Sequence, residues 1–192
     1  QWEQATAEAR QAQRAAREGY YFGRAEAHRA VGEPDLAVAD YTRALELLES
    51  AAVAESWVAV DQATKDQLTE TAGETAQAQW EQATAEARQA QRAAREGYYF
   101  GRAEARRALG ELDLALADYD LAIELDESNG AYLLGRSKTY LQLGRDEQAQ
   151  TDYSAATELD PALADDEHEA ALAGEVPAET EQGDEATEEV ST

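Results

Sequence analysis

The sequence predicts an all-α fold, and three observations lead to this prediction. Ala, Glu, Gln, Arg and Leu dominate the 192 residues, which include only three Pro, so the composition favours helix along nearly the whole chain. Residues 1–27 return without a change as residues 79–105. A shorter period of 34 residues separates Gly110 from Gly144. Repeats of this length are typical of solenoids, in which similar helical units stack on one another.

The identical stretch belongs to a longer duplication with a period of 78 residues. Beyond it, residues 28–50 match residues 106–128 at 15 of 23 positions, and after residue 50 the similarity ends. The duplication therefore copied more than one helix, and it carried the neighbours of that helix with it.

Three shorter units align on a turn glycine, which is Gly32, Gly110 or Gly144. In each unit a small residue stands seven positions before the glycine, and Ala, Tyr and Ala follow five, nine and twelve positions after it: Ala25, Ala37, Tyr41 and Ala44; Ala103, Ala115, Tyr119 and Ala122; Ser137, Ala149, Tyr153 and Ala156. The pattern predicts a first helix of about 13 residues, a glycine turn with positive φ and a second helix.

These spacings resemble the tetratricopeptide repeat family, whose 34-residue helix–turn–helix unit has small residues, an aromatic residue and Ala at these positions. With the glycine at position fifteen, the units are residues 18–51, 96–129 and 130–163. The resemblance implies a solenoid of antiparallel helix pairs and covers about half of the chain. It is incomplete, because the aromatic residue expected at position eleven is present only in the third unit, as Tyr140.

Elementary physical chemistry supports the second helix of each unit. Its apolar residues recur at helical spacing and predict a buried stripe, which in the first unit consists of Ala37, Tyr41, Ala44, Leu45 and Leu48. Asp35 and Asp113 stand at the start of this helix in the first two units. A carboxylate there can accept backbone N–H bonds and meets the positive end of the helix dipole.

The segments outside the clear units also read as helix. Residues 1–17 predict an N-terminal helix with a narrow alanine stripe, and residues 52–95 predict a degenerate helical hairpin. We expect this hairpin to contain one helix over residues 52–72, which Gly73 ends, and another over residues 79–95. The N-terminal helix would then be a second helix whose first-helix partner is missing.

The chain changes character at about residue 164. Residues 164–192 contain 11 acidic residues and no Lys or Arg. We expect a short capping helix between Asp165 and Ala173 and a disordered acidic tail beyond Gly174. The tail is expected to aid solubility. The alternative is that it docks on a basic partner or on the protein's own arginine-bearing groove.

Charge and composition argue against several classes of partner. The formal net charge is −25, from 41 acidic and 16 basic residues, which argues against nucleic acid and anionic membrane surfaces. No apolar run is long enough for membrane insertion. The absence of Cys excludes disulfides and thiol catalysis.

Because the sequence contains no Met and shows no signal peptide, we expect a processed product or a segment of a longer array, either cytoplasmic or exported after removal of a signal.

The sequence offers little for catalysis. His28 and His168 are the only histidines, and no nucleotide-binding, metalloprotease or serine-hydrolase motif is present. His28 takes the aromatic position of the first unit and is expected to pack or to lie on the helix surface. The acidic run around His168 would hold a divalent cation weakly at best, because nothing orders its ligands. We therefore expect no enzyme activity, no cofactor and no metal.

The tetratricopeptide resemblance also implies a binding groove. In that family the first helices line the concave face, and ligands contact the fifth, ninth and twelfth positions among others. In this sequence these positions select Phe22, Glu26, Arg29, Phe100, Glu104, Arg107, Leu134 and Lys138. Helical spacing places Phe, Glu and Arg on one stripe, which suits a peptide with an apolar anchor. The alternative is that Phe packs against a neighbouring helix while Glu and Arg form an exposed pair.

These observations predict a non-catalytic protein-interaction scaffold that binds a protein or peptide on the concave face of the solenoid. The alternative is a self-assembling structural protein, because the terminal helices of a solenoid expose faces that can stack head-to-tail into oligomers or filaments.

Three further residues, each beside a glycine, predict a contact between units rather than a ligand site: Arg24, Arg102 and Arg136.

Overall fold

The computed structural model describes residues 2–56 and 62–174. They form α1 (Trp2–Ala30), α2 (Pro34–Ser56), α3 (Gln62–Leu109), α4 (Leu112–Leu125), α5 (Gly130–Gln142), α6 (Asp146–Leu159), a short 3-10 helix (Pro161–Leu163) and α7 (Asp166–Leu172). These described residues contain no strand, and the predicted all-α fold is confirmed.

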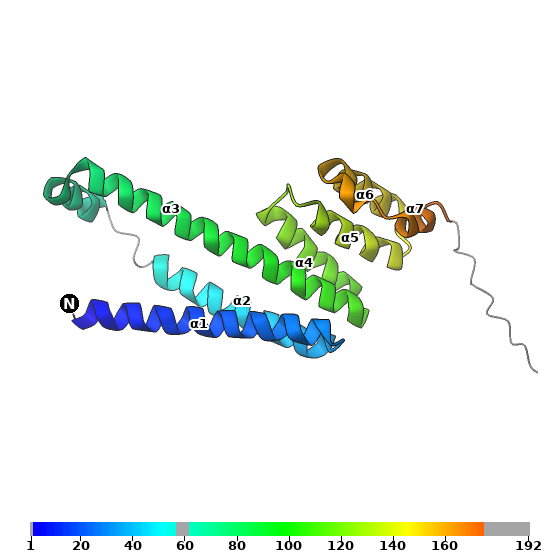
Figure 1. Cartoon of the computed structure of the whole chain (residues 1–192), viewed down its shortest axis with the longest axis horizontal. Coiled ribbons are helices and arrows are strands. Elements are labelled where there is room, and N and C mark those ends of the chain that lie inside the picture. Colours follow the sequence, from blue (N-terminus) through cyan, green and yellow to red (C-terminus); the bar gives the residue numbers. More distant parts are fainter. Residues whose placement is uncertain (1, 57–61, 175–192) are drawn as a thin grey trace, which may run out of the picture.

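Consecutive helices form three antiparallel pairs, α1 with α2, α3 with α4 and α5 with α6. The turn glycines Gly32, Gly110 and Gly144 have φ values of 76°, 79° and 66°, as the sequence predicts. Glycine suits these turns because it adopts positive φ without a steric penalty. Figure 1 shows the pairs in series, with α1 and α2 at one end and α6 and α7 at the other. The predicted solenoid of antiparallel helix pairs is confirmed.

The second helices bury the predicted stripe. Tyr41 and Tyr119 are fully buried, and Tyr153 is nearly so. The other buried members of the stripe in the first unit are Ala37, Ala44, Leu45 and Leu48. Small residues at the helix crossings let the two backbones approach closely, and the tyrosine rings fill the space between one pair and the next.

The array bends toward its first helices. α1 contacts α3 and α3 contacts α5, whereas α2, α4 and α6 make no contact with one another within the described residues. First helices that touch, with second helices that stand apart, give a curved stack. The face formed by α1, α3 and α5 is therefore the inner face of the solenoid.

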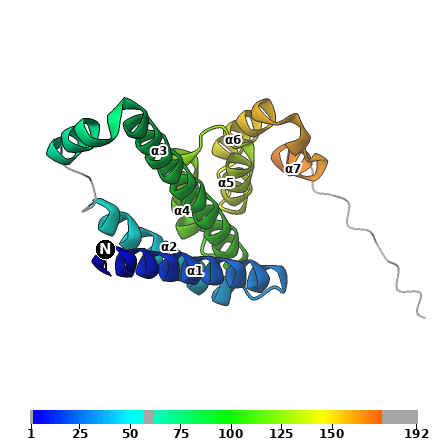
Figure 2. The same cartoon turned by 60° about the vertical axis from the view of Figure 1, so that its left-hand side comes forward.

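The helix boundaries before two of the units differ from the prediction. Residues 1–17 do not form a separate element, because α1 continues into the first unit as one helix. The expected end at Gly73 is also wrong, because α3 is helical from Gln62 to Leu109. A single glycine costs a helix only about 1 kcal/mol relative to Ala, and the Ala-, Gln- and Arg-rich sequence on its C-terminal side favours helix strongly. Figure 2 shows that the first part of α3 bends away from the straight remainder.

The division into units and linking segments stays a prediction. Residues 57–61 of the expected helix 52–72 lie outside the described residues, and α2 extends across the expected boundary at residue 51 to Ser56. The predicted capping role of Asp113 is not seen, because the side chain at the N-cap of α4 belongs to Glu111 and makes no capping hydrogen bond. Asp113 lies in the first turn of α4, where it still meets the helix dipole favourably.

The last helix, α7, lies between Asp165 and Ala173 and packs on α5 and α6. His168 of this helix is buried, with only 5 % of the residue exposed. Its ring centroid lies 4.7 Å from that of Tyr153, and its Nε2 lies 2.8 Å from Ser137 Oγ. The Ser137 hydroxyl donates to Ala149 O, so Nε2–H is the donor toward Ser137. Residues 175–192, which include the predicted disordered tail, lie outside the described residues.

Candidate functional site

Each unit is held together by an ion pair between its two helices. Nε and Nη2 of an arginine on the first helix donate to both carboxylate oxygens of an aspartate on the second helix, with distances of 2.8 and 2.7 Å for Arg102 and Asp118. Asp118 is only 1 % exposed and accepts a third bond, from Arg106 Nη1 at 2.7 Å. The pairs recur at the same unit positions: Arg24–Asp40, Arg102–Asp118 and Arg136–Asp152.

The predicted contact of these arginines between units is therefore only a minor part of their role. Their carboxylate partner lies within their own unit, which sequence reasoning missed although an Asp precedes each buried Tyr. A third nitrogen does reach the preceding unit, from Arg136 Nη1 to Asp120 at 2.7 Å and from Arg102 Nη1 to Thr42 Oγ1 at 3.3 Å. The arginines fix the angle of each helix pair and help to place it on its neighbour.

A tyrosine ring and a glycine form the main contact between units. The ring of Tyr41 covers Gly101, and the ring of Tyr119 covers Gly135, where an added Cβ would lie 2.5 Å from Tyr119 Cε1. No side chain fits at either glycine without moving the tyrosine. This contact sets the spacing of the first helices, and it thereby sets the shape of the inner face.

The two phenylalanines of the predicted binding stripe join neighbouring first helices. Phe22 stacks on Tyr98 with ring centroids 4.7 Å apart, and Phe100 lies 5.0 Å from Tyr132. Both phenylalanines are only partly buried. They form an apolar floor between units, with part of each ring left at the surface.

The predicted glutamates and arginines form oriented pairs beside this floor. Glu26 accepts a hydrogen bond from the hydroxyl of Tyr41 and another, at 2.7 Å, from Arg29 Nη2. Partial burial raises the pKa of Glu26, but the hydrogen bonds from Arg29 and Tyr41 outweigh it and hold the pKa below its ordinary value. Glu104 repeats the arrangement in the second unit, with Tyr119 and Arg107.

Lys138, at the third-unit end of the predicted binding stripe, contacts the residue that precedes α7. Lys138 Nζ donates to Asp165 Oδ2 at 3.1 Å, while Leu134 lies partly buried one turn earlier on α5. A hollow of about 310 Å³ adjoins this pair and is lined by Arg107, Lys138, Leu141, Gln142, Asp165, His168 and Ala171. Among the described residues, the buried Nε of Arg107 has no hydrogen-bond partner. Cationic groups of α3 and α5 therefore meet beside a carboxylate.

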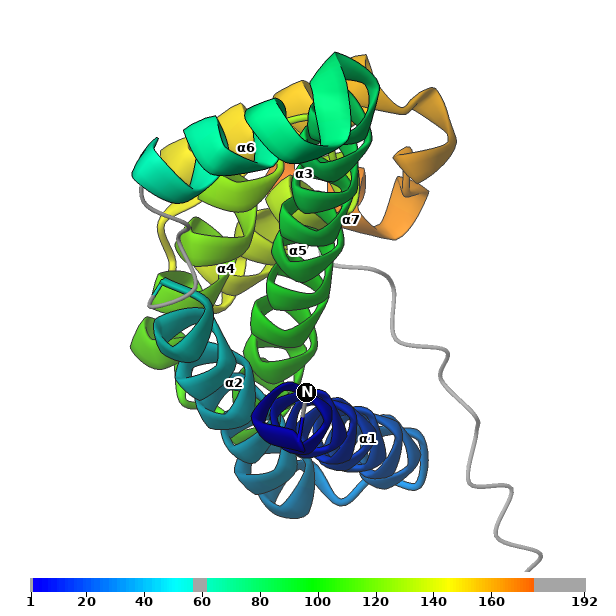
Figure 3. The same cartoon turned by 90° about the vertical axis from the view of Figure 1, so that its left-hand side faces the viewer.

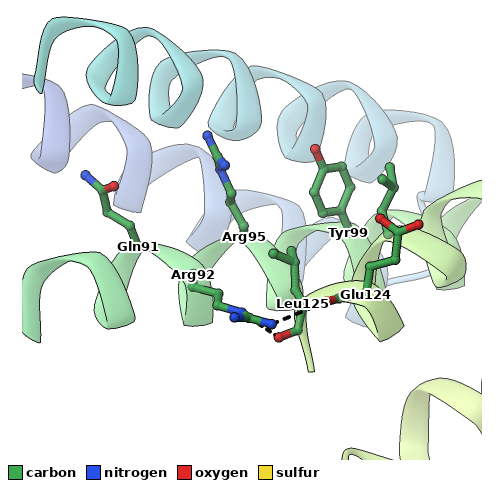
Figure 4. Close-up of a pocket in the computed structure, with 7 residues that line it drawn as sticks. Gln91, Arg92, Arg95, Tyr99, Glu124 and Leu125 are labelled. Atoms are coloured by element: carbon green, nitrogen blue, oxygen red, sulfur yellow. Dashed lines mark hydrogen bonds between the residues drawn. The ribbon is translucent and has the colours of Figure 1, made fainter. Parts of the chain in front are cut away.

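A second hollow, of about 540 Å³, lies between α3 and α4. Arg92 Nε donates to Leu125 O at 2.6 Å and thus caps the C-terminal end of α4. Figure 4 shows Arg95 and Tyr99 projecting from α3 in the same direction, while Arg92 reaches toward Leu125. Sequence reasoning placed Arg92 and Arg95 in a packing helix and missed this site. The available signal was two arginines three residues apart in a strongly acidic chain.

The described residues contain no group of three or more His, Asp or Glu side chains placed to hold a metal ion. None of the described helices combines the length and the apolar character that crossing a membrane requires.

Comparison with known proteins agrees with the geometry. A family model described as tetratricopeptide repeat matches residues 97–129 and 131–163, one residue inside the units predicted from the glycine spacing. Residues 18–51 lie outside these two matches, and no curated protein matches the chain. Repeats of this kind generally mediate protein–protein interactions and are typically not catalytic. The second and third units therefore match the tetratricopeptide repeat family, and this match covers residues 97–129 and 131–163.

Proposed function

We propose that this protein is a non-catalytic scaffold that binds a partner protein on the inner face formed by α1, α3 and α5. The general role of tetratricopeptide repeats in protein–protein interaction supports the proposal. The contact of each first helix with the next also supports it, because this contact produces one continuous surface.

The distribution of charge on this face carries the proposal. The chain has a net charge of −25, yet the predicted stripe positions of α1, α3 and α5 carry Arg29, Arg107 and Lys138, each paired with a carboxylate of the same chain. Glu26 and Glu104 pair with the two arginines and with buried tyrosine hydroxyls, so their carboxylates orient the guanidinium groups. A partner would lay apolar side chains near the phenylalanine floor and acidic side chains near the basic groups.

The hollow between Arg107 and Lys138 indicates the chemistry of the contact. Lys138 already holds a carboxylate, that of Asp165, at 3.1 Å. Arg107 lines the same hollow as Lys138. An Asp or Glu side chain of a partner segment would pair with these two cationic side chains, and it would compete with Asp165 for the lysine.

A capture experiment with matched variants tests the proposal. The wild-type chain and a variant with Arg107→Glu and Lys138→Glu are immobilised and exposed to an extract of the native source. The control carries Arg43→Glu and Arg145→Glu, which change the net charge equally but lie on the outer helix α2 and in the α5–α6 turn. We expect a protein that binds the wild type and the control but not the inner-face variant. Equal capture by all three chains contradicts the proposal.

A further inference from the structure

One amino-acid sequence occupies two environments in this molecule. Residues 1–27 and 79–105 are identical, but Tyr20 is 60 % exposed whereas Tyr98, at the same position of the copy, is 7 % exposed. The equivalent Tyr132 of the third unit is 5 % exposed. In the second and third units this tyrosine packs on a phenylalanine of the preceding unit, which the first unit lacks among the described residues.

The same difference holds one and two turns further along α1. An added Cβ at Gly101 would overlap the ring of Tyr41, whereas nothing lies within 4 Å of the same position at Gly23. Ala105 is 1 % exposed, and its counterpart Ala27 lies at the surface. Tyr20, Gly23 and Ala27 form the open face of α1. Figure 3 shows α1 at the end of the stack, with α2 and α3 to one side and no described helix beyond it.

A hydrogen-bond donor beside the open face lacks the partner that its counterparts have. Arg102 and Arg136 each extend Nη1 to a side chain of the preceding second helix, Thr42 or Asp120. Arg24 Nη1 instead reaches Tyr20 of its own helix, at 3.4 Å. The open face of α1 therefore has the same shape, the same tyrosine and the same hydrogen-bond donor that its identical copy on α3 uses to pack against α2.

We propose that the open face of α1 binds α6 of a second copy of this chain, head-to-tail, when α7 leaves that helix. The internal copy shows which surface fits, namely a second helix with Ala, Tyr and Ala at the spacing of Ala37, Tyr41 and Ala44. α6 repeats that spacing as Ala149, Tyr153 and Ala156. The inference does not rest on the proposed function, although both involve the contact of Lys138 with Asp165.

α6 is the second helix that can become accessible to another copy, because the helix that covers it is short. α2 and α4 are covered by α3 and α5, which have 48 and 13 residues, whereas Tyr153 is covered by α7, which has only seven. α7 is held by His168 against Tyr153 and Ser137 and by Asp165 at Lys138. α7 and the open face of another copy compete for the same tyrosine. In the stacked arrangement, Ser154 takes the place of Thr42 and accepts from Arg24.

The test measures mass against concentration by analytical ultracentrifugation, in 0.5 M salt to screen the repulsion between acidic chains. His168→Glu places a carboxylate in the buried contact beside Asp165 and Glu169, and it should release α7. We expect the apparent mass of this variant to rise toward at least twice that of the monomer. Adding Gly23→Ala should restore the monomer, because the new methyl group occupies the site of the incoming ring.

Gly19→Ala is the matched control. It makes the same change on the same helix, and neither Gly19 nor its counterpart Gly97 faces an atom within 4 Å. His168→Glu with Gly19→Ala should therefore associate as His168→Glu alone does. A monomer at every concentration for His168→Glu, with its helical circular dichroism intact, overturns the proposal. Association that Gly23→Ala leaves unchanged also overturns it.

A crosslinking experiment decides the question if His168→Glu does not fold. The chain contains no Cys, so single cysteines can be introduced into the otherwise unaltered protein. Arg24→Cys and Ser154→Cys chains are mixed and oxidised, because transient opening of a short helix lets a disulfide trap the stack. We expect heterodimers in clear excess over a mixture of Gly19→Cys and Ser154→Cys chains. Equal yields from the two mixtures overturn the proposal.

Discussion

The ring of Tyr119 covers the backbone of Gly135, and this is the main contact between the second unit and the third. The hydroxyl of the same tyrosine donates to Glu104 on the inner face. Glu104 in turn accepts from Arg107 at 2.7 Å. The residue that sets the spacing of the units therefore also orients a charged pair of the proposed binding face.

Identical glycines in the two copies are expected to respond oppositely to alanine. Gly23→Ala should stabilise the protein by about 0.5–1 kcal/mol, because alanine favours helix and the site is open. Gly101→Ala should destabilise it by about 1–3 kcal/mol, because the methyl group overlaps the ring of Tyr41. Urea denaturation followed by circular dichroism measures both. Effects of the same sign would contradict the packing described for Gly101.

The buried aspartate of the second unit is expected to matter more than that of the first. Asp118→Asn removes the charge facing Arg102 and Arg106, whose side chains are 13 % and 17 % exposed, and should cost about 3–5 kcal/mol. Asp40→Asn leaves Arg24, which is 43 % exposed and can be hydrated, so we expect about 1 kcal/mol. Equal losses in thermal and urea unfolding would show that solvent exposure does not set the strength of these pairs.

The docking of α7 is expected to weaken as the pH falls below about 6.5. Burial, and then the charge of Lys138, lower the pKa of His168, while Asp165 opposes the shift. In a released α7, His168 has its ordinary pKa and takes up a proton at a higher pH than in the docked helix. Docking is therefore complete above this ordinary pKa and is lost as the pH falls toward the lowered pKa of the docked state. Tyr153 and Ser137 contact the ring, Glu169 bonds to Tyr153, and Arg107 and Gln142 line the same hollow as His168.

Nuclear magnetic resonance of the α7 amides between pH 7.5 and 5 measures this docking. In His168→Gln no imidazole can be protonated, so the population of docked α7 should stay constant over the same range. A wild-type α7 that remains fully docked at pH 5 would contradict the prediction.

Alkaline unfolding should begin only above the ordinary tyrosine pKa of about 10. Burial, together with an adjacent carboxylate, raises the pKa of Tyr41, Tyr98 and Tyr119 above that value. Since the unfolded chain loses these protons first, the stability of the fold is complete below pH 10 and falls as the pH rises further. Ultraviolet absorption of tyrosinate should show these three ionising together with the loss of helix. Ionisation of all tyrosines before unfolding would contradict the burial.

Sequence reasoning predicted the elements that depend on local chemistry. The positive φ of Gly32, Gly110 and Gly144 and the buried tyrosine stripe follow from residue type and spacing alone. The length of α3 did not follow, because an isolated glycine such as Gly73 ends a helix only when tertiary contacts favour a turn there.

The candidate site was only partly predictable. Spacing selected Glu26, Arg29 and Lys138, but it could not show that Lys138 holds Asp165, which lies 27 residues away and approaches only after α7 folds back. The aspartate partners of the three arginines were visible as a recurring Asp-Tyr pair. Their significance depends on which faces of two helices meet, and this is a property of the packed structure.

The duplicated stretch gives this protein an internal reference for hydrogen exchange. An amide in an unfolded chain exchanges at a rate set by its neighbouring residues, and those neighbours are the same around Tyr20 and Tyr98. Any difference in protection between these two amides therefore reports only the structure around them. A ratio of the two rates that approaches one under some condition would reveal that the exposed helix end has acquired a neighbour.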